Sequence, residues 1–196
     1  MGSAFPEIHL VRHGETEWSA AGRHTGRTDI ALTAAGEAAA RRLQTRLQGL
    51  RVAAVWTSPS RRARQTCALA GFGVGSVVDP DLAEWDYGAY EGLTTEQILA
   101  RRPGWRLFRD GCPDGESVAE IGLRADRVVA RLRELGRNAL LFSSSHFLRV
   151  LAARWLGLPP QAGALLALDT ASQSILGYEH DPDEPIIRRW NLVQPG

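Results

Sequence analysis

The sequence predicts an α/β fold, a three-layer α/β/α sandwich with a mostly parallel central sheet. Short apolar runs rich in branched residues alternate along the chain with longer segments that have helical periodicity. This alternation is typical of parallel sheets covered by helices on both faces. The length of 196 residues suits one domain, and no repeat, low-complexity tract or interdomain linker interrupts it. We therefore expect a single domain over residues 1–196.

The expected elements follow in chain order from the apolar pattern. Ile8 to Val11 is a short branched run, which is typical of a buried strand. Thr33 precedes an amphipathic helix, and Thr94 and Ser117 each begin the spacing of a capping box. Further strands are expected at 52–57, 76–78, 139–143, 175–179 and 186–190, further helices at 60–70, 117–135 and 147–156, and a loop at 79–92.

Charge and hydropathy exclude several classes of protein. The net charge of +1 creates no field that would attract nucleic acid or an anionic membrane. No stretch approaches the roughly 18 apolar residues of a membrane helix. The first residues lack the basic run and apolar segment of a signal peptide. We therefore expect a cytoplasmic protein with neither a nucleic-acid partner nor a membrane partner.

Two features of the composition limit the chemistry. All 23 basic residues are arginine, which excludes Schiff-base chemistry and a P-loop lysine. Arginine offers planar forks of donors that suit phosphate or carboxylate. Cys67 and Cys112 form no close metal-ligand pair, although one bridge between them stays open at this point. We expect no metal and no other cofactor.

Polar and reactive residues follow three of the expected strands. The first strand leads into Arg12-His13-Gly14, the second into Thr57-Ser58-Pro59 and then Arg61-Arg62, and the fourth into 143–146. Ligands of open parallel sheets bind beyond the carboxyl ends of the strands. If these strands are neighbours, arginines, a histidine and hydroxyls meet in one cleft. Such a cleft suits a phosphoryl dianion.

These residues belong to a longer series of motifs. They are the segments 10–16 (Leu-Val-Arg-His-Gly-Glu-Thr), 25–29, 32–36, 57–66, 82–92 and 110–117. In this order the series resembles the histidine phosphatase superfamily, also called phosphoglycerate-mutase-like. The resemblance extends from residue 10 to about residue 155, which is most of the chain.

The resemblance implies a role for each matching residue. His13 is the expected nucleophile, and Arg12 and Arg62 are the expected phosphate clamps. Flanking guanidinium groups disfavour a protonated imidazole, so His13 is expected to be neutral. The alternative is that His13 only packs in the core.

Glu84 matches the general acid of the family. Such a carboxyl must stay protonated near neutral pH, which burial and a phosphate dianion both favour. Asp86 and Glu91 lie nearby, and we expect them to be structural.

The resemblance also suggests substrate contacts outside the catalytic residues. Thr25 and Gly26 match positions where a hydroxyl and a backbone N–H approach the substrate, although a simple turn would have the same sequence. Ser19 and Tyr87 are further expected contacts, as are Ser145 and His146.

The chain departs from the family pattern after its fourth strand. The family has Ser-His-Gly or Ala-His-Gly there, whereas this chain has Ser143-Ser144-Ser145. Ser144 replaces the second catalytic histidine, and Ser145 replaces the glycine. Three interpretations stay open: Ser144 donates one hydrogen bond in a slower enzyme, His146 turns into the pocket, or the changes mark a lost or engineered activity. A serine lacks the cationic form that would stabilise the transition state.

We expect a phosphatase. Family mutases resemble one another in a longer chain with a lysine-bearing insert, and this chain has no lysine. Segments 18–19, 87–92 and 109–112 are similar to those of sugar-phosphate phosphatases, including sedoheptulose-bisphosphatase-like enzymes. The leading hypothesis is metal-independent hydrolysis of a small phosphate monoester, such as a sugar phosphate, through a phosphohistidine on His13. The alternatives are a phosphoglycerate mutase and a phospholigand-binding protein without turnover. The sequence does not specify which ester is used, and it leaves a homodimer open.

Overall fold

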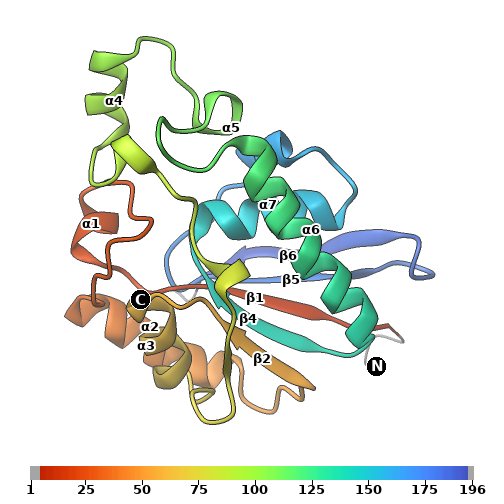
Figure 1. Cartoon of the computed structure of the whole chain (residues 1–196). Helices are drawn as coiled ribbons and strands as arrows, with labels where there is room; N and C mark the ends of the chain where they lie inside the picture. Colours follow the sequence, from red (N-terminus) through yellow and green to blue (C-terminus); the bar gives the residue numbers. More distant parts are fainter. Residues whose placement is uncertain (1–4, 194–196) are drawn as a thin grey trace.

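A six-stranded sheet, in the order β3-β2-β4-β1-β5-β6, runs through the part of the molecule that the computed structural model describes, residues 5–193 (Figure 1). Its strands are β1 (Ile8–Arg12), β2 (Ala54–Thr57), β3 (Val77–Val78), β4 (Ala139–Ser143), β5 (Gln173–Tyr178) and β6 (Pro185–Leu192). The first four strands are parallel, and β5 and β6 join antiparallel. The mostly parallel sheet is confirmed. The expectation about a signal peptide concerns residues 1–4, which lie outside the described range.

The sheet is buried on both faces, which explains why its central strands are almost continuously apolar. Leu10 pairs with Leu141, and Val11 pairs with Phe142 in the next register position. The first pair belongs to a large apolar cluster with helix α6, and the second belongs to a smaller cluster with helix α2. Successive side chains of a strand point to opposite faces. The alternation within β1 and β4 therefore divides the core into these two layers.

Helices cover both faces of the sheet. α2 (Ala34–Arg46) and α3 (Arg61–Leu69) lie on one face, and α6 (Val118–Leu135) and α7 (Ser145–Trp155) lie on the other (Figure 1). Both capping boxes form: Ser117 accepts from Glu120 N at the start of α6, and Thr94 accepts from Gln97 N at the start of α4 (Thr95–Arg101). The three-layer α/β/α arrangement is confirmed.

Two expectations about individual elements are wrong. The segment 79–92 contains two short 3-10 helices, Pro80–Leu82 and Gly88–Tyr90, because single turns of helix leave no periodicity to detect. Helix α7 begins at Ser145 rather than at residue 147. Its N-cap is Ser144, so Ser145 and His146 lie in its first turn. The short helices α1 (Glu17–Ala20) and α5 (Leu107–Asp110) were not expected at all.

Both cysteines are free thiols, which removes the bridge that the sequence left open. Burial raises the pKa of Cys67 to about 11 and the pKa of Cys112 to about 12. Neither thiol is therefore activated as a nucleophile.

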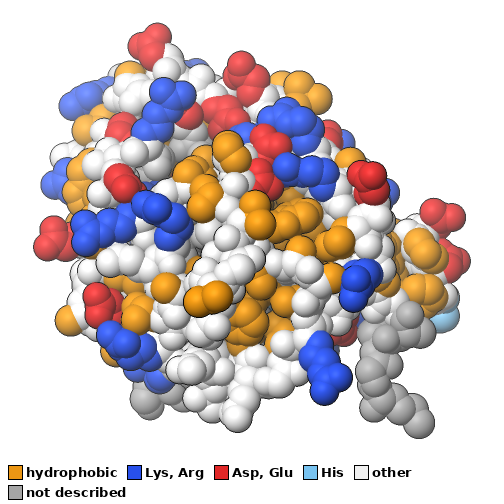
Figure 2. All heavy atoms as spheres, turned by 60° about the horizontal axis from the view of Figure 1, so that its bottom comes forward, with side chains coloured by type: hydrophobic (Ala, Val, Ile, Leu, Met, Phe, Trp, Pro, Cys, Tyr) orange, Lys and Arg blue, Asp and Glu red, His pale blue; other side chains and the backbone are white. Residues whose placement is uncertain are grey.

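The surface mixes charged and apolar side chains. Figure 2 shows apolar side chains gathered toward the centre of one face and charged side chains around them. The most exposed large apolar residues include Val74, Val77 and Val78 near the edge strand β3. No helix within residues 5–193 is long and apolar enough to cross a membrane. Association of two copies into a homodimer stays a prediction.

Candidate active site

The carboxyl ends of β1, β4 and β2 bring the expected site residues together. Arg12 lies opposite Ser143 in the parallel register, and His13 N donates to Ser143 O at 2.9 Å. At the end of β2, Ser58 N donates to Phe142 O at 2.8 Å. These three strand ends are therefore neighbours, which is the condition under which their polar residues were expected to meet in one cleft.

His13 is buried directly beyond β1, with 5% of its surface exposed. Its Nδ1 lies 2.7 Å from Gly14 O. Nδ1 therefore carries the ring proton and donates a hydrogen bond to this carbonyl. The lone pair of Nε2 is then available for attack. Burial holds the pKa of His13 well below 6.5, and the charges of Arg62 and Arg12 lower this pKa further.

The turn after His13 requires a glycine. A Cβ on Gly14 would lie 2.5 Å from Gly36 O, inside the van der Waals contact between the turn and α2. Gly14 N also donates to Thr66 Oγ1 of α3 at 3.0 Å. The two helices on this face therefore fix the backbone that carries the imidazole.

Arg62 extends from the first turn of α3, and its side chain is fully buried. Its Nη2 donates to Thr25 O at 2.8 Å and to Gly26 O at 3.1 Å, and its Nη1 donates to Thr28 O at 3.1 Å. These bonds fix the loop at 25–28, and Nε of Arg62 has no partner among residues 5–193. On the other side of His13, Nη1 of Arg12 donates to Leu168 O at 2.5 Å.

Three buried donors around His13 lack a hydrogen-bond partner in the described structure. They are Arg12 Nε, Arg62 Nε and Ser144 Oγ. Ser144 is fully buried at the N-cap of α7, yet its hydroxyl makes no capping bond. Buried polar groups in folded proteins are nearly always paired. Unpaired donors on both sides of one histidine therefore indicate a site for an anion.

Glu84 is held against the N-terminus of α7. Its Oε1 accepts from Trp85 N and from Phe147 N, each at 2.8 Å. Its Oε2 accepts from His146 N at 3.1 Å. Oε2 therefore accepts fewer of these bonds than Oε1. The positive charge of Arg12 and of Arg62 interacts with this carboxylate, which places Glu84 beside the clamps.

The other two carboxylates near Glu84 have structural partners. Asp86 accepts from Gly88 N at 3.0 Å and pairs with Arg27 at 2.7 Å. Glu91 accepts from the backbone N–H groups of Gly26 and Thr28.

His146 is hydrogen-bonded to Tyr87. Tyr87 Oη lies 2.6 Å from His146 Nδ1. Burial holds the pKa of Tyr87 well above 10.0, so the phenol is neutral and donates this hydrogen bond. Burial, Arg149 and His24 hold the pKa of His146 well below 6.5. His146 is thus a neutral ring at the positive end of a helix, where a cation is disfavoured.

Several of the expected substrate contacts already have partners within the chain. The hydroxyl of Ser19 accepts from Thr16 N and donates to Thr16 O, which completes the capping box of α1. Thr25 Oγ1 donates to Arg23 O at 3.1 Å, and Gly26 N donates to Glu91. Ser145 lies half-buried in the first turn of α7.

Sequence reasoning missed two residues that border the site. The His24 ring lies 4.8 Å from the Tyr87 ring and 6.0 Å from the His146 ring, measured between centroids. Arg149 of α7 lies over Phe108, 4.7 Å from its ring centroid, and its charge interacts with Glu84. His24 directly precedes the motif at 25–29, which was the one available signal.

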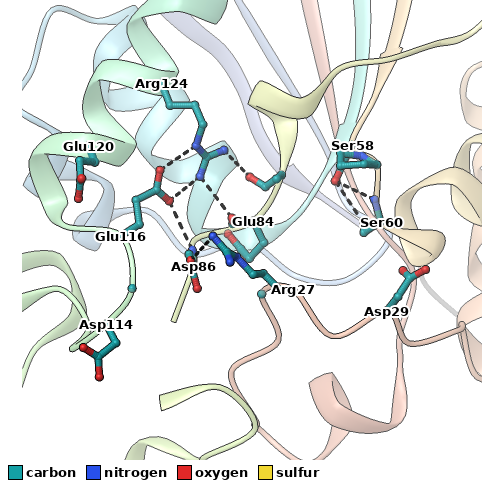
Figure 3. A pocket seen from close by; sticks show the side chains of 14 residues that line it. Arg27, Asp29, Ser58, Ser60, Glu84, Asp86, Asp114, Glu116, Glu120 and Arg124 are labelled. Carbon is teal, nitrogen blue, oxygen red and sulfur yellow. Dashed lines mark hydrogen bonds and ion pairs between the residues drawn. The ribbon is translucent and has the colours of Figure 1, made fainter. Parts of the chain in front are cut away.

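An open cavity of about 770 Å³ adjoins Glu84 and Gly26. Figure 3 shows that its walls carry mostly acidic side chains, with Arg27 and Arg124 paired to Asp86 and Glu116. Within the described range, no group of three or more His, Cys, Asp or Glu side chains is placed to hold a metal ion.

The protonation of His13 gives a direct prediction. Because its pKa lies well below 6.5, we expect the His13 ring to stay neutral as the pH falls through 6.5. The exposed His180 serves as an internal control, since its bond to Glu184 raises its pKa and it gains its proton first. Ring nitrogen chemical shifts from NMR separate the two residues. A titration of His13 at or above pH 6.5 would contradict the neutral nucleophile.

Comparison with known proteins agrees with this geometry. Residues 8–193 match the model of the histidine phosphatase superfamily (branch 1). The chain is 45% identical over 184 residues to an acid phosphatase of Mycobacterium tuberculosis, covering 92% of this chain and 90% of that protein. It is 37% identical over 195 residues to sedoheptulose 1,7-bisphosphatase of Saccharomyces cerevisiae, covering 82% of this chain and 71% of that protein.

A mutase and a solved structure are also similar to the chain. It is 34% identical over 186 residues to a probable phosphoglycerate mutase, GpmB, of Enterobacter sp., covering 90% of this chain and 86% of that protein. The structure of the open reading frame Rv3214 of Mycobacterium tuberculosis has a TM-score of 0.91 at 43% identity, covering 96% of this chain and 98% of that one. The chain therefore belongs to the histidine phosphatase superfamily (branch 1) and is an enzyme of this type.

Proposed function

We propose that the enzyme hydrolyses a small phosphate monoester through a phosphohistidine on His13, without a metal ion. The observation that carries this proposal is the neutral, buried His13 between Arg12 and Arg62, each of which keeps one buried donor unpaired. A phosphoryl group bound there would receive the hydrogen bonds that the protein leaves unmade. Two guanidinium charges would also balance a phosphate dianion.

In the first step, Nε2 of His13 attacks phosphorus in line with the ester oxygen. The P–N bond forms while the P–O bond to the leaving alcohol breaks. Oε2 of Glu84 gives its proton to the departing oxygen. Arg12 Nε, Arg62 Nε and Ser144 Oγ donate to the phosphoryl oxygens, whose charge they stabilise in the transition state.

In the second step, water attacks the phosphohistidine. Glu84, now ionised, takes a proton from the water, and the P–N bond breaks. Inorganic phosphate leaves, while His13 and the protonated Glu84 are restored. One carboxyl thus serves as acid and then as base.

The proposed substrate is a sugar phosphate or a similar small ester. The acid phosphatase and sedoheptulose 1,7-bisphosphatase among the relatives support an ester of this size. Dedicated phosphoglycerate mutases resemble one another in a longer chain with a lysine-bearing insert, and the absence of lysine from this chain favours hydrolysis over their reaction. The GpmB relative keeps the mutase reaction as the alternative.

The test is a panel of phosphate monoesters assayed for phosphate release in the presence of a chelator. We expect turnover of small esters that the chelator does not reduce, and no interconversion of phosphoglycerates. Strict dependence on a metal would contradict the proposed chemistry. Calorimetry that shows tight binding of the esters without any phosphate release would favour a binding protein instead.

A further inference from the structure

Arg124 of α6 is buried below the segment that carries Glu84, and no step of the proposed reaction uses it. Only 11% of its side chain is exposed. Its Nη1 donates to Asp81 O at 2.8 Å and to Ala83 O at 2.6 Å, and its Nη2 donates to Glu84 O at 3.3 Å. One guanidinium thus binds three backbone carbonyls of a segment with little regular structure.

The same guanidinium also contacts the residue that holds the Glu84 carboxylate. Its Cζ lies 4.6 Å from the ring centroid of Phe147, and Phe147 N donates to Glu84 Oε1. Arg124 therefore supports Glu84 from two directions, through its backbone and through the first turn of α7.

Glu116 completes the arrangement on the far side of Glu84. It pairs with Arg124 through Nε at 2.8 Å and Nη2 at 2.7 Å (Figure 3). Its backbone N donates to Asp86 O at 2.9 Å, and its backbone O accepts from Trp85 Nε1 at 2.7 Å. The Arg124–Glu116 pair thus fixes the chain both before and after Glu84.

We propose that Arg124 is a positioning residue for the general acid, an inference that rests on the proposed function. The planar guanidinium of arginine is required for this role, because the ammonium group of a lysine cannot bind three carbonyls and a carboxylate at once. A general acid must lie within hydrogen-bond reach of the leaving oxygen. An error of about 1 Å in its position can cost about 100-fold in rate.

The proposal predicts a loss that depends on the leaving group. Alkoxide leaving groups depart only with a proton from Glu84, whereas p-nitrophenolate departs without one. A misplaced Glu84 therefore slows alkyl esters and spares p-nitrophenyl phosphate. A general loss of structure would slow both classes equally.

The experiment measures kcat/KM for a series of phosphate monoesters from p-nitrophenyl phosphate to glycerol phosphate. Arg124→Met is expected to lose about 100-fold on glycerol phosphate and less than about threefold on p-nitrophenyl phosphate. Glu84→Gln, which removes the acid itself, is expected to give the same dependence on the leaving group with a larger loss.

Two further variants make the result specific. Arg127→Met is the matched control, since Arg127 lies on α6 and bonds the carboxylate of Asp81 but none of the three carbonyls. We expect it to keep full activity on every ester. Arg124→Lys retains the charge opposite Glu116, so it is expected to fold. Its loss of kcat/KM should depend on the leaving group in the same way but be smaller. If Arg124→Met does not fold, Arg124→Lys decides whether Arg124 positions Glu84.

The outcomes separate this inference from the proposed function. The positioning role is overturned if the Arg124 variants lose kcat/KM equally on all esters, or lose none, while Glu84→Gln still shows a loss that depends on the leaving group. If Glu84→Gln itself shows no dependence on the leaving group, the acid role in the proposed function is wrong, and the role of Arg124 is overturned with it.

Discussion

Replacing His13 with Ala is expected to lower kcat/KM for phosphate monoesters by about 10⁴-fold or more. The variant lacks the atom to which phosphorus is transferred in the proposed reaction. The side chain is buried and bonds only the neighbouring Gly14 O, so the fold is expected to persist. Steady-state phosphate release measures the loss, and circular dichroism confirms folding.

His180→Ala is the matched control for this variant. His180 lies exposed in the turn between β5 and β6, where it pairs with Glu184. Its removal is expected to leave turnover unchanged. The His13→Ala enzyme should still bind inorganic phosphate in calorimetry, because Arg12 and Arg62 remain. Activity of that variant within about tenfold of the native enzyme would exclude His13 as the nucleophile.

Replacing Ser144 with His and Ser145 with Gly is expected to raise kcat/KM by about 10²-fold. Ser144 Oγ is buried without a partner among the described residues, and the resemblance to the family places an imidazole at this position. A protonated imidazole adds a charged donor to the phosphoryl oxygens. The positive end of α7 opposes that charge. The gain should therefore grow as the pH falls toward the range in which the new histidine is protonated.

Ser145→Gly alone is the control, and no gain is expected from it. Ser144→Ala measures what the present hydroxyl contributes to the reaction. We expect this variant to lose about tenfold or less in kcat/KM. If the double replacement folds and gives no gain at any pH, position 144 does not face the phosphoryl group, and the departure from the family pattern has another cause.

The positions of His13, Arg12 and Arg62 could be predicted in part, because local patterns determine them. Parallel strands bring their carboxyl ends to one edge of a sheet, and Arg12 and His13 lie near the residues that follow β2 and β4 because these three strands are also neighbours in the sheet. Arg62 then follows in the first turn of the next helix. The segment 79–92 could not be predicted in the same way. Its first helical turn, Pro80–Leu82, is bonded to α6, and its second, Gly88–Tyr90, is bonded to Pro113 O, so neither leaves a periodic pattern in the sequence.

The environment of Glu84 was also beyond sequence reasoning. Its carboxylate is held by backbone N–H groups of α7, more than 60 residues away, which no pattern in the sequence marks. Arg124 had the same appearance as any other arginine of an amphipathic helix. The hydrogen bond between His146 and Tyr87 also joins distant segments, and no pattern in the sequence marks it. Each of these features comes from packing between distant segments.

The most direct test of the account is to identify the phosphorylated residue. Glu84→Gln should accumulate the intermediate when p-nitrophenyl phosphate is supplied, because transfer to His13 then needs no acid while hydrolysis lacks its base. Mass spectrometry of peptides prepared under alkaline conditions locates the phosphoryl group. The account predicts a phosphoryl group on Nε2 of His13 that is stable to alkali and labile to acid. A chain that turns over without carrying phosphate, or that carries it on another residue, would contradict the account.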